Sequence, residues 1–72
     1  MTDSIKQTLE GKKVIITAGD QATAADALDN LIDRINDWMK NDGWVCVQDA
    51  AMETMKEMSQ WGIDDLSIKV VD

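Results

Sequence analysis

Four aspartates with helical spacing are the residues of this chain best suited to act together. They lie three, four and four residues apart and are Asp26, Asp29, Asp33 and Asp37. At about 100° per residue, these intervals place the four carboxylates on one narrow face of a helix. A row of negative charges of this kind can contact water, cations or a basic protein surface.

The same segment is apolar on its opposite side. The apolar positions are Ala24, Ala25, Leu28, Leu31, Ile32, Ile35, Trp38 and Met39. This pattern predicts an amphipathic helix from about Asp20 to Asn41, with one face toward a core and the other toward solvent. Like charges four residues apart destabilise a helix by only a few tenths of a kcal/mol per pair. This loss of stability is small enough for the helix to keep the aspartates if they serve a function.

The acidic row has two interpretations. Arg34 lies on the flank of the row and Lys40 is within reach of Asp37, so one end is expected to be partly neutralised. In the first reading the row docks on a basic partner. In the second it is a solvated face that keeps a small protein from aggregating.

Enzyme chemistry has little support in the residue types. The chain has no histidine, which removes the commonest general base and metal ligand. Cys46 lies between Val45 and Val47 without a nearby cation, so we expect a small buried apolar residue and not a nucleophile. Catalysis by paired carboxylates needs a cleft, which a domain this small rarely contains. We therefore predict no enzyme activity and no catalytic residues.

The acidic turns do not resemble cation sites. Asn41-Asp42-Gly43 and Asp64-Asp65 lack the alternating ligands and the final bidentate glutamate of a calcium loop. The four glycines are dispersed and each serves a turn or a helix end, so no phosphate-binding loop is present. We expect neither a metal nor a cofactor.

The net charge of −7 limits the possible partners. It repels phosphate backbones and attracts basic surfaces, so we expect a protein partner and no direct nucleic acid. Lys12-Lys13 is the only adjacent basic pair, which is too little for a nucleic-acid or membrane patch.

Three tryptophans supply all the aromatic bulk: Trp38, Trp44 and Trp61. One reading packs them into the core at the helix ends. The other leaves Trp44, or Trp61 together with Met52, exposed as an apolar docking patch.

The expected compartment is the cytoplasm. A single cysteine cannot form an internal disulfide, which suits a reducing environment. No apolar run approaches the ~20 residues that span a bilayer. Because Met1-Thr2-Asp3-Ser4 has neither a basic region nor an apolar stretch, we expect no targeting segment.

The first elements expected are two strands. Ile5 to Leu9 alternates apolar and polar residues, Glu10-Gly11-Lys12 makes a turn, and Val14 to Thr17 is β-branched. These features predict a β-hairpin. A short helix from Ser4 to Glu10 is the alternative, because the segment is too short to decide by periodicity.

The ends of the long helix are marked by capping residues. Asp20 or Thr23 can cap its start. Gly43 can adopt the left-handed conformation at its end, with Trp44 contacting Met39 as in a Schellman motif.

A second helix is predicted from Asp49, its N-cap, to Trp61. Its inward residues are Ala51, Met55 and Met58, with Met52 and Trp61 on the flanks. Gly62 ends it and places Ile63 against Met58. For Val45 to Gln48, residue type favours a strand, whereas the alignment of Val47 with Ala51 favours a helix; we predict a strand.

Leu66 to Val71 completes the chain as a terminal strand, which predicts one α+β domain over residues 1–72 without a linker. Two amphipathic helices should cover one face of a small, mainly antiparallel sheet, formed by the N-terminal hairpin and the C-terminal strand.

The functional hypothesis is a protein-binding module, with inhibition by docking on a basic, nucleic-acid-binding surface as its expected mode of action. The contact residues would be the four aspartates together with Trp44 and Trp61. The alternative is a structural subunit that acts through homo-oligomer assembly. A chain this short buries only about 60% of its unfolded surface, and its last strand offers an edge to a second copy.

Overall fold

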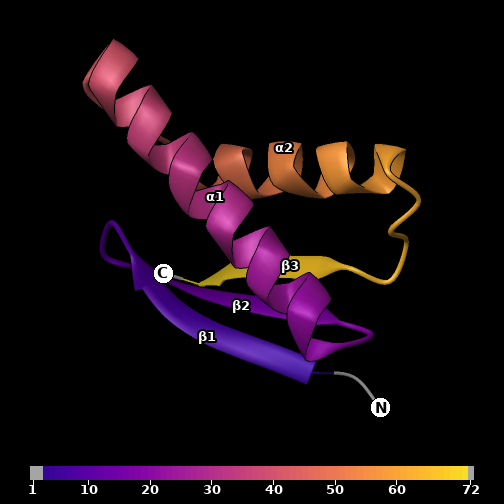
Figure 1. Cartoon of the computed structure of the whole chain (residues 1–72). Coiled ribbons are helices and arrows are strands. Elements are labelled where there is room, and N and C mark those ends of the chain that lie inside the picture. Colours follow the sequence, from indigo (N-terminus) through magenta and orange to yellow (C-terminus); the bar gives the residue numbers. More distant parts are fainter. Residues whose placement is uncertain (1–2, 72) are drawn as a thin grey trace.

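The chain folds into a three-stranded sheet with two helices on one of its faces (Figure 1). This computed structural model describes residues 3–71; Met1 and Thr2, which enter the expectation about targeting, lie outside the described residues. In chain order the elements are β1 (Asp3–Leu9), β2 (Lys12–Ala18), α1 (Gln21–Asp42), α2 (Val47–Gln60) and β3 (Ser67–Val71). The sheet is antiparallel with β2 in the centre, so the predicted α+β architecture is confirmed.

The N-terminal hairpin has a two-residue turn. β1 and β2 pair without a bulge from Asp3 opposite Ala18 to Leu9 opposite Lys12. Glu10 and Gly11 both have positive φ angles, 51° and 79°, as a type I′ turn requires. This turn matches the natural twist of paired strands. The alternative of a short helix from Ser4 to Glu10 is therefore wrong.

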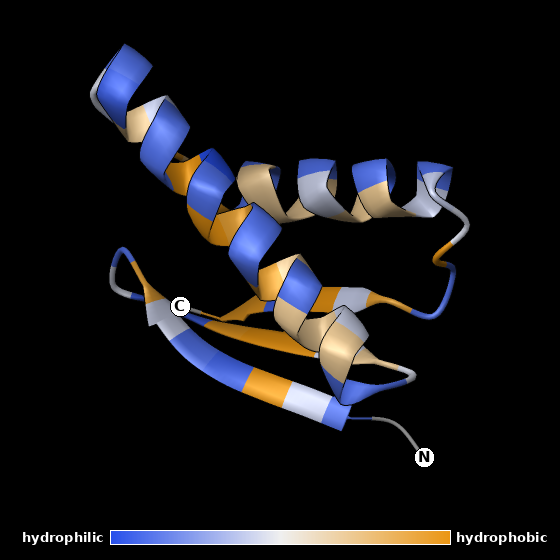
Figure 2. Ribbon diagram, viewed as in Figure 1, coloured by the Kyte–Doolittle hydropathy of each residue, from blue (hydrophilic) through white to orange (hydrophobic). Residues whose placement is uncertain are grey.

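The core lies between the sheet and the helices. Val14, Ile16 and Ala18 alternate along β2 and are fully buried, and Ile68 of β3 pairs beside Ile16. Figure 2 shows the hydrophobic central strand beneath the helices, and the hydrophilic stripe of α1 facing away from the sheet. α1 contacts β1 and β2, whereas α2 contacts β3 and packs beside α1.

The helix α1 is continuous, and its predicted apolar side is buried in part: three of the eight residues are buried, four are partly buried and Met39 is exposed. Ala24, Leu31 and Ile35 are buried as expected, and Ala27 joins them. Met39 is 37% exposed, because the end of α1 extends past the sheet. Gly43 has a φ of 79° and donates its N–H to the Met39 carbonyl over 3.0 Å. This is the simpler left-handed ending and not the predicted Schellman motif.

Asp20 is the N-cap of α1, and its removal is expected to weaken the helix. Its side chain accepts a hydrogen bond of 2.7 Å from the Thr23 N–H. This bond also holds the pKa of the Asp20 carboxyl below its ordinary value of 3.8. We expect Asp20→Ala to lower the Tm at pH 7 by roughly 5 °C, measured by thermal circular dichroism.

The lowered pKa fixes the direction of the pH dependence. The capping contribution is fully present above the unfolded pKa and is lost as the pH falls through the lower folded value. Asp20→Asn keeps an acceptor oxygen, so its Tm at pH 7 should stay near that of the parent while less stability is lost below pH 3.8. Equal acid sensitivity in the two proteins would contradict this role of Asp20.

The prediction of a strand over Val45 to Gln48 is wrong, because α2 begins at Val47. Val47 is 3% exposed and joins the core, and this burial outweighs the β preference of a valine. The N-cap is Cys46 and not Asp49, which lies instead in the first turn of α2. A carboxylate there still interacts favourably with the helix dipole.

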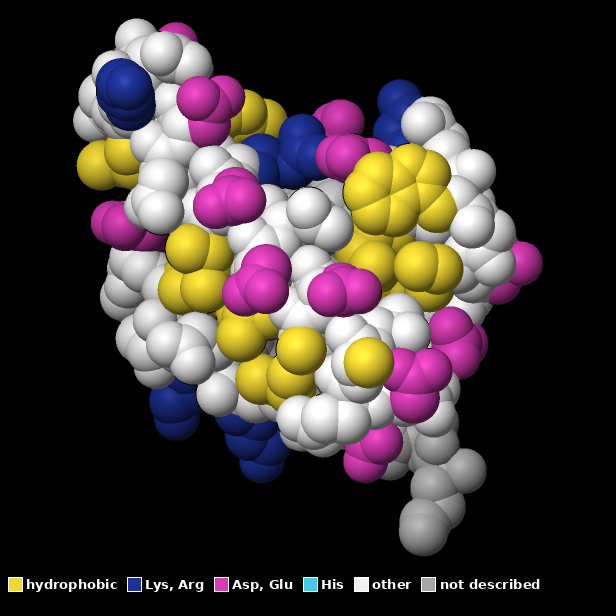
Figure 3. Space-filling model, viewed as in Figure 1, with side chains coloured by type: hydrophobic (Ala, Val, Ile, Leu, Met, Phe, Trp, Pro, Cys, Tyr) yellow, Lys and Arg dark blue, Asp and Glu magenta, His cyan; other side chains and the backbone are white. Residues whose placement is uncertain are grey.

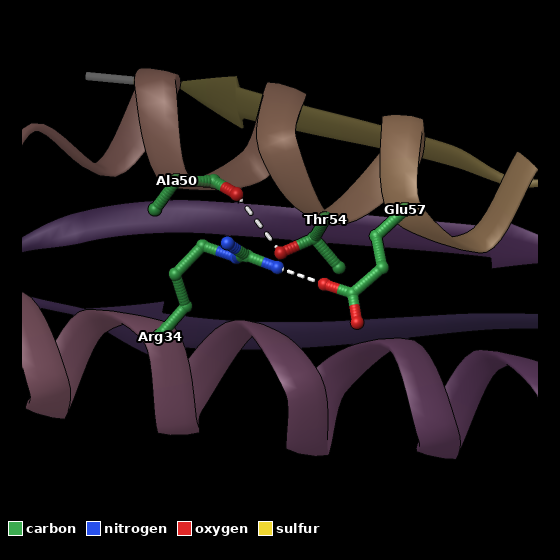
Figure 4. Close-up of polar contacts among 4 residues, drawn as sticks. All are labelled: Arg34, Ala50, Thr54 and Glu57. Atoms are coloured by element: carbon green, nitrogen blue, oxygen red, sulfur yellow. Dashed lines mark hydrogen bonds and ion pairs between the residues drawn. The ribbon is translucent and has the colours of Figure 1, made fainter. Parts of the chain in front are cut away.

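The end of α2 is a Schellman motif. Ile63 donates its N–H to the Met58 carbonyl over 3.1 Å, and Gly62 donates to the Ser59 carbonyl over 3.0 Å. The predicted helix end at Gly62 is therefore confirmed. Thr54 is buried although polar, and its hydroxyl donates to the Ala50 carbonyl over 2.8 Å (Figure 4). That bond satisfies the hydroxyl without a partner outside the helix.

Candidate interaction surface

The four aspartates form one exposed row, which we call the acidic face: Asp26, Asp29, Asp33 and Asp37. All four side chains are exposed on an unbroken helix. Within residues 3–71, none of them makes an ion pair or a side-chain hydrogen bond. In Figure 3, carboxylates follow α1 diagonally across the molecule. Their charge is therefore available to a partner.

Arg34 does not neutralise the acidic face. Its side chain turns away from the aspartates toward α2, where it forms an ion pair with Glu57 (Figure 4). The Nε atom of Arg34 is buried and has no hydrogen-bond partner among the described residues. Within residues 3–71, Lys40 also forms no ion pair with Asp37. Neither cation therefore forms an ion pair with the row among residues 3–71.

A further carboxylate lies at the beginning of α1. The Asp65 side chain occupies the space where a Cβ on Gly19 would stand, so the absence of a side chain at Gly19 allows this approach. Asp65 is thereby placed beside Asp20, the exposed N-cap of α1. Asp42 is five residues beyond Asp37 and so points to a different side of the helix. Asp20 precedes Asp26 by six residues, which is about 120° around the helix, so it does not extend the acidic face, and Asp65 lies near it at the start of α1.

Hollows connect the acidic face to both exposed tryptophans. A hollow of about 540 Å³ runs beside Asp33, Asp37, Arg34 and Trp38. It shares Arg34 with a hollow of about 430 Å³ at Trp61, and Trp38 with one of about 190 Å³ at Trp44.

The two tryptophans do not form a single patch. Trp44 is 68% exposed and Trp61 is 62% exposed. They lie at opposite ends of the 14-residue helix α2, about 20 Å apart. Each can therefore serve only as a separate apolar contact beside the acidic face.

The outer face of the sheet is a second charged surface, which was not predicted from the sequence. Alternation along the strands directs Lys6, Lys13 and Lys69 away from the helices. The outward positions of the three strands include no Asp or Glu. The sequence did not mark these three lysines as a group, because they come together only through the register of the strands. Figure 3 shows basic side chains projecting from beneath the sheet.

The described residues offer no arrangement for metal chemistry. No group of three or more His, Cys, Asp or Glu residues in the range 3–71 is placed to hold a metal ion. Cys46 is a free thiol, partly buried at the start of α2, where the sequence predicted a buried residue.

Neither α1 nor α2, the helices of the described part of the chain, has the length and apolar character needed to cross a membrane. No family model matches this chain, and comparisons with curated proteins and with solved structures found no match.

Proposed function

We propose that this chain is a small protein-binding module that docks on a basic surface of a partner protein through its acidic face. The observation that carries the proposal is the row of four exposed aspartates without ion pairs in the described structure, beside an Arg34 that is paired with Glu57. A partner with lysines or arginines in a row would satisfy these charges, and opposite potentials also speed association. Trp61 and Trp44 would add separate apolar contacts beside the row.

A nucleic-acid-binding surface is the class of basic surface that fits the spacing best, and occupying it would make the chain an inhibitor. From Asp20 to Asp37 the helix rises about 26 Å. Six carboxylates lie along this distance when Asp65 is included, with an average separation of ~5 Å. A single nucleic-acid strand carries one charge per ~3.4 Å. The acidic character of the chain is consistent with such a partner, and its one free cysteine is consistent with a reducing cytoplasm.

The test compares two variants with the same net charge. The face variant changes Asp29, Asp33 and Asp37 to Asn, which moves the net charge from −7 to −4. We expect it to bind the captured partner about tenfold to a hundredfold more weakly, because each exposed charge pair contributes roughly 0.2–1 kcal/mol. Affinity capture at low and high salt identifies the partner, and titration calorimetry measures the affinities.

The control variant makes an equal change of charge away from the face. It combines Asp42→Asn, Glu53→Gln and Asp64→Asn, which also gives −4. We expect its affinity and salt dependence to stay close to those of the parent protein. If the two variants lose affinity equally, net charge and not the acidic face directs binding.

A second candidate function is assembly into a homo-oligomer. It is favoured by the strands β1 and β3, each of which pairs only with β2 over residues 3–71 and so presents a free edge. Sedimentation equilibrium tests it directly. A dimer that separates only on unfolding would support assembly through an edge, and a strict monomer at high micromolar concentration would contradict it.

A further inference from the structure

The outer face of the sheet is an uncovered basic surface. Lys6 of β1, Ile15 of β2 and Lys69 of β3 form one row across the strands. Lys13 lies two residues from Ile15 and faces the same way. The remaining outward positions of the strands are serine, threonine and valine, so within residues 3–71 no acidic strand residue on this face offsets the three positive charges.

The three lysines lie close together on the outer face, and two of them line a shallow depression. Lys6 and Lys69 are two strands apart, which is about 10 Å, and each lies about 8 Å from Lys13. A hollow of about 380 Å³ is lined by Lys6 and Lys13, with Ile15 and Val71 contributing apolar surface, and Lys69 lies outside this lining. Val71 is 38% exposed. The surface therefore offers a few apolar contacts beside three cations.

The same chain carries the complementary surface. On α1 the carboxylates of Asp29, Asp33 and Asp37 follow one another at a rise of about 6 Å, over about 12 Å in total. The three lysines span a similar length, and their flexible side chains can adjust to the remaining difference. Neither surface can reach the other within one molecule, because the sheet and its core separate them.

We propose that the outer sheet face binds the acidic face of a second copy of this chain. Such a contact joins two different surfaces, so each pair retains one free acidic face and one free basic face, and further copies can add to both ends. The net charge of −7 on each copy opposes the approach. Association should therefore be weak, appearing at high micromolar concentration and disappearing in high salt.

A second copy fits this surface better than a nucleic acid does. Duplex DNA carries one negative charge per ~1.7 Å, many more than three lysines can neutralise, and the rest of this acidic chain would repel it. The contact uses the carboxylates of the proposed function but needs no foreign partner. Bound copies and a basic partner would compete for the same acidic face.

The experiment uses two variants that each keep one of the two surfaces. The sheet variant, Lys6→Gln with Lys13→Gln and Lys69→Gln, keeps the acidic face. The face variant with Asn at Asp29, Asp33 and Asp37 keeps the basic surface. All six side chains are exposed, so both variants should fold, which circular dichroism verifies.

Sedimentation equilibrium at about 20 mM ionic strength is expected to show each variant alone as a monomer, because Debye screening is weakest there and one surface is missing. The equimolar mixture should approach twice the mass of one chain and no more. The parent protein should exceed that mass, and 0.5 M salt should return every sample to monomer. Lys56→Gln, an exposed cation on α2, should associate like the parent.

Several results would overturn the proposal. A parent protein that stays monomeric at low salt, or a mixture that stays monomeric while the parent associates, removes the contact between the two faces. Variants that each dimerise alone, without salt dependence, point to pairing of strand edges instead. Binding of a short DNA duplex to the parent but not to the sheet variant, without any self-association, assigns the surface to nucleic acid. Because none of these samples contains a partner protein, these outcomes do not bear on the proposed binding of such a partner.

Discussion

Leu31→Ala is expected to lower the free energy of unfolding by about 2–5 kcal/mol, which is typical for truncating a fully buried leucine. Leu31 is 0% exposed and lies on the side of α1 that faces the sheet. A chain of 72 residues has a total stability of about 4–11 kcal/mol. One substitution can therefore remove about half of the stability, since so small a core cannot collapse around the cavity without losing other contacts.

Urea unfolding followed by circular dichroism measures this loss. Leu28→Ala is the matched control, because Leu28 is on the same helix but only partly buried, and it should cost clearly less. Equal losses for the two leucines would show that helix propensity, and not burial against the sheet, decides the effect.

Breaking the Arg34–Glu57 ion pair is expected to have the next largest effect. This pair joins α1 to α2, and its side chains are 23% and 41% exposed. Glu57→Ala leaves a partly buried guanidinium without its carboxylate, and we expect a loss of about 1–2 kcal/mol, reduced from the buried case by solvent screening. Arg34→Ala should cost about the same or more, because the packing of its hydrocarbon stem is also lost.

A double-mutant cycle separates the pair from these other losses. If the two groups stabilise each other, Arg34→Ala with Glu57→Ala should cost less than the sum of the single changes, by about 1 kcal/mol. The cycle should weaken in 1 M salt, as a partly exposed pair is screened. Additive single effects would show that Arg34 acts through packing alone.

Periodicity predicted the elements that are long or strongly patterned. α1 carries apolar residues at helical spacing over five turns, and the acidic face follows directly from the same spacing. Gly62 and Gly43 marked the helix ends correctly, because glycine adopts the left-handed conformation with little strain. At both positions the chemistry is local, so sequence neighbours suffice.

The features that sequence reasoning missed depend on contacts between distant segments. The local preference of Val47 favoured a strand, but tertiary burial placed it in the first turn of α2. The pairing of Arg34 with Glu57 depends on how the two helices pack, which spacing within one helix does not specify. The convergence of Lys6 with Lys69 depends on strand register across β2. For the same reason, the position of Asp65 beside Gly19 was not predictable.

The placement of opposite charges on opposite sides gives the molecule a permanent electric dipole, with its negative end along α1 and its positive end beneath the sheet. The field of a basic protein exerts a torque on such a dipole before the two surfaces touch. An incoming molecule would therefore rotate during diffusion and arrive with α1 leading, so that a larger share of collisions begins in a productive orientation.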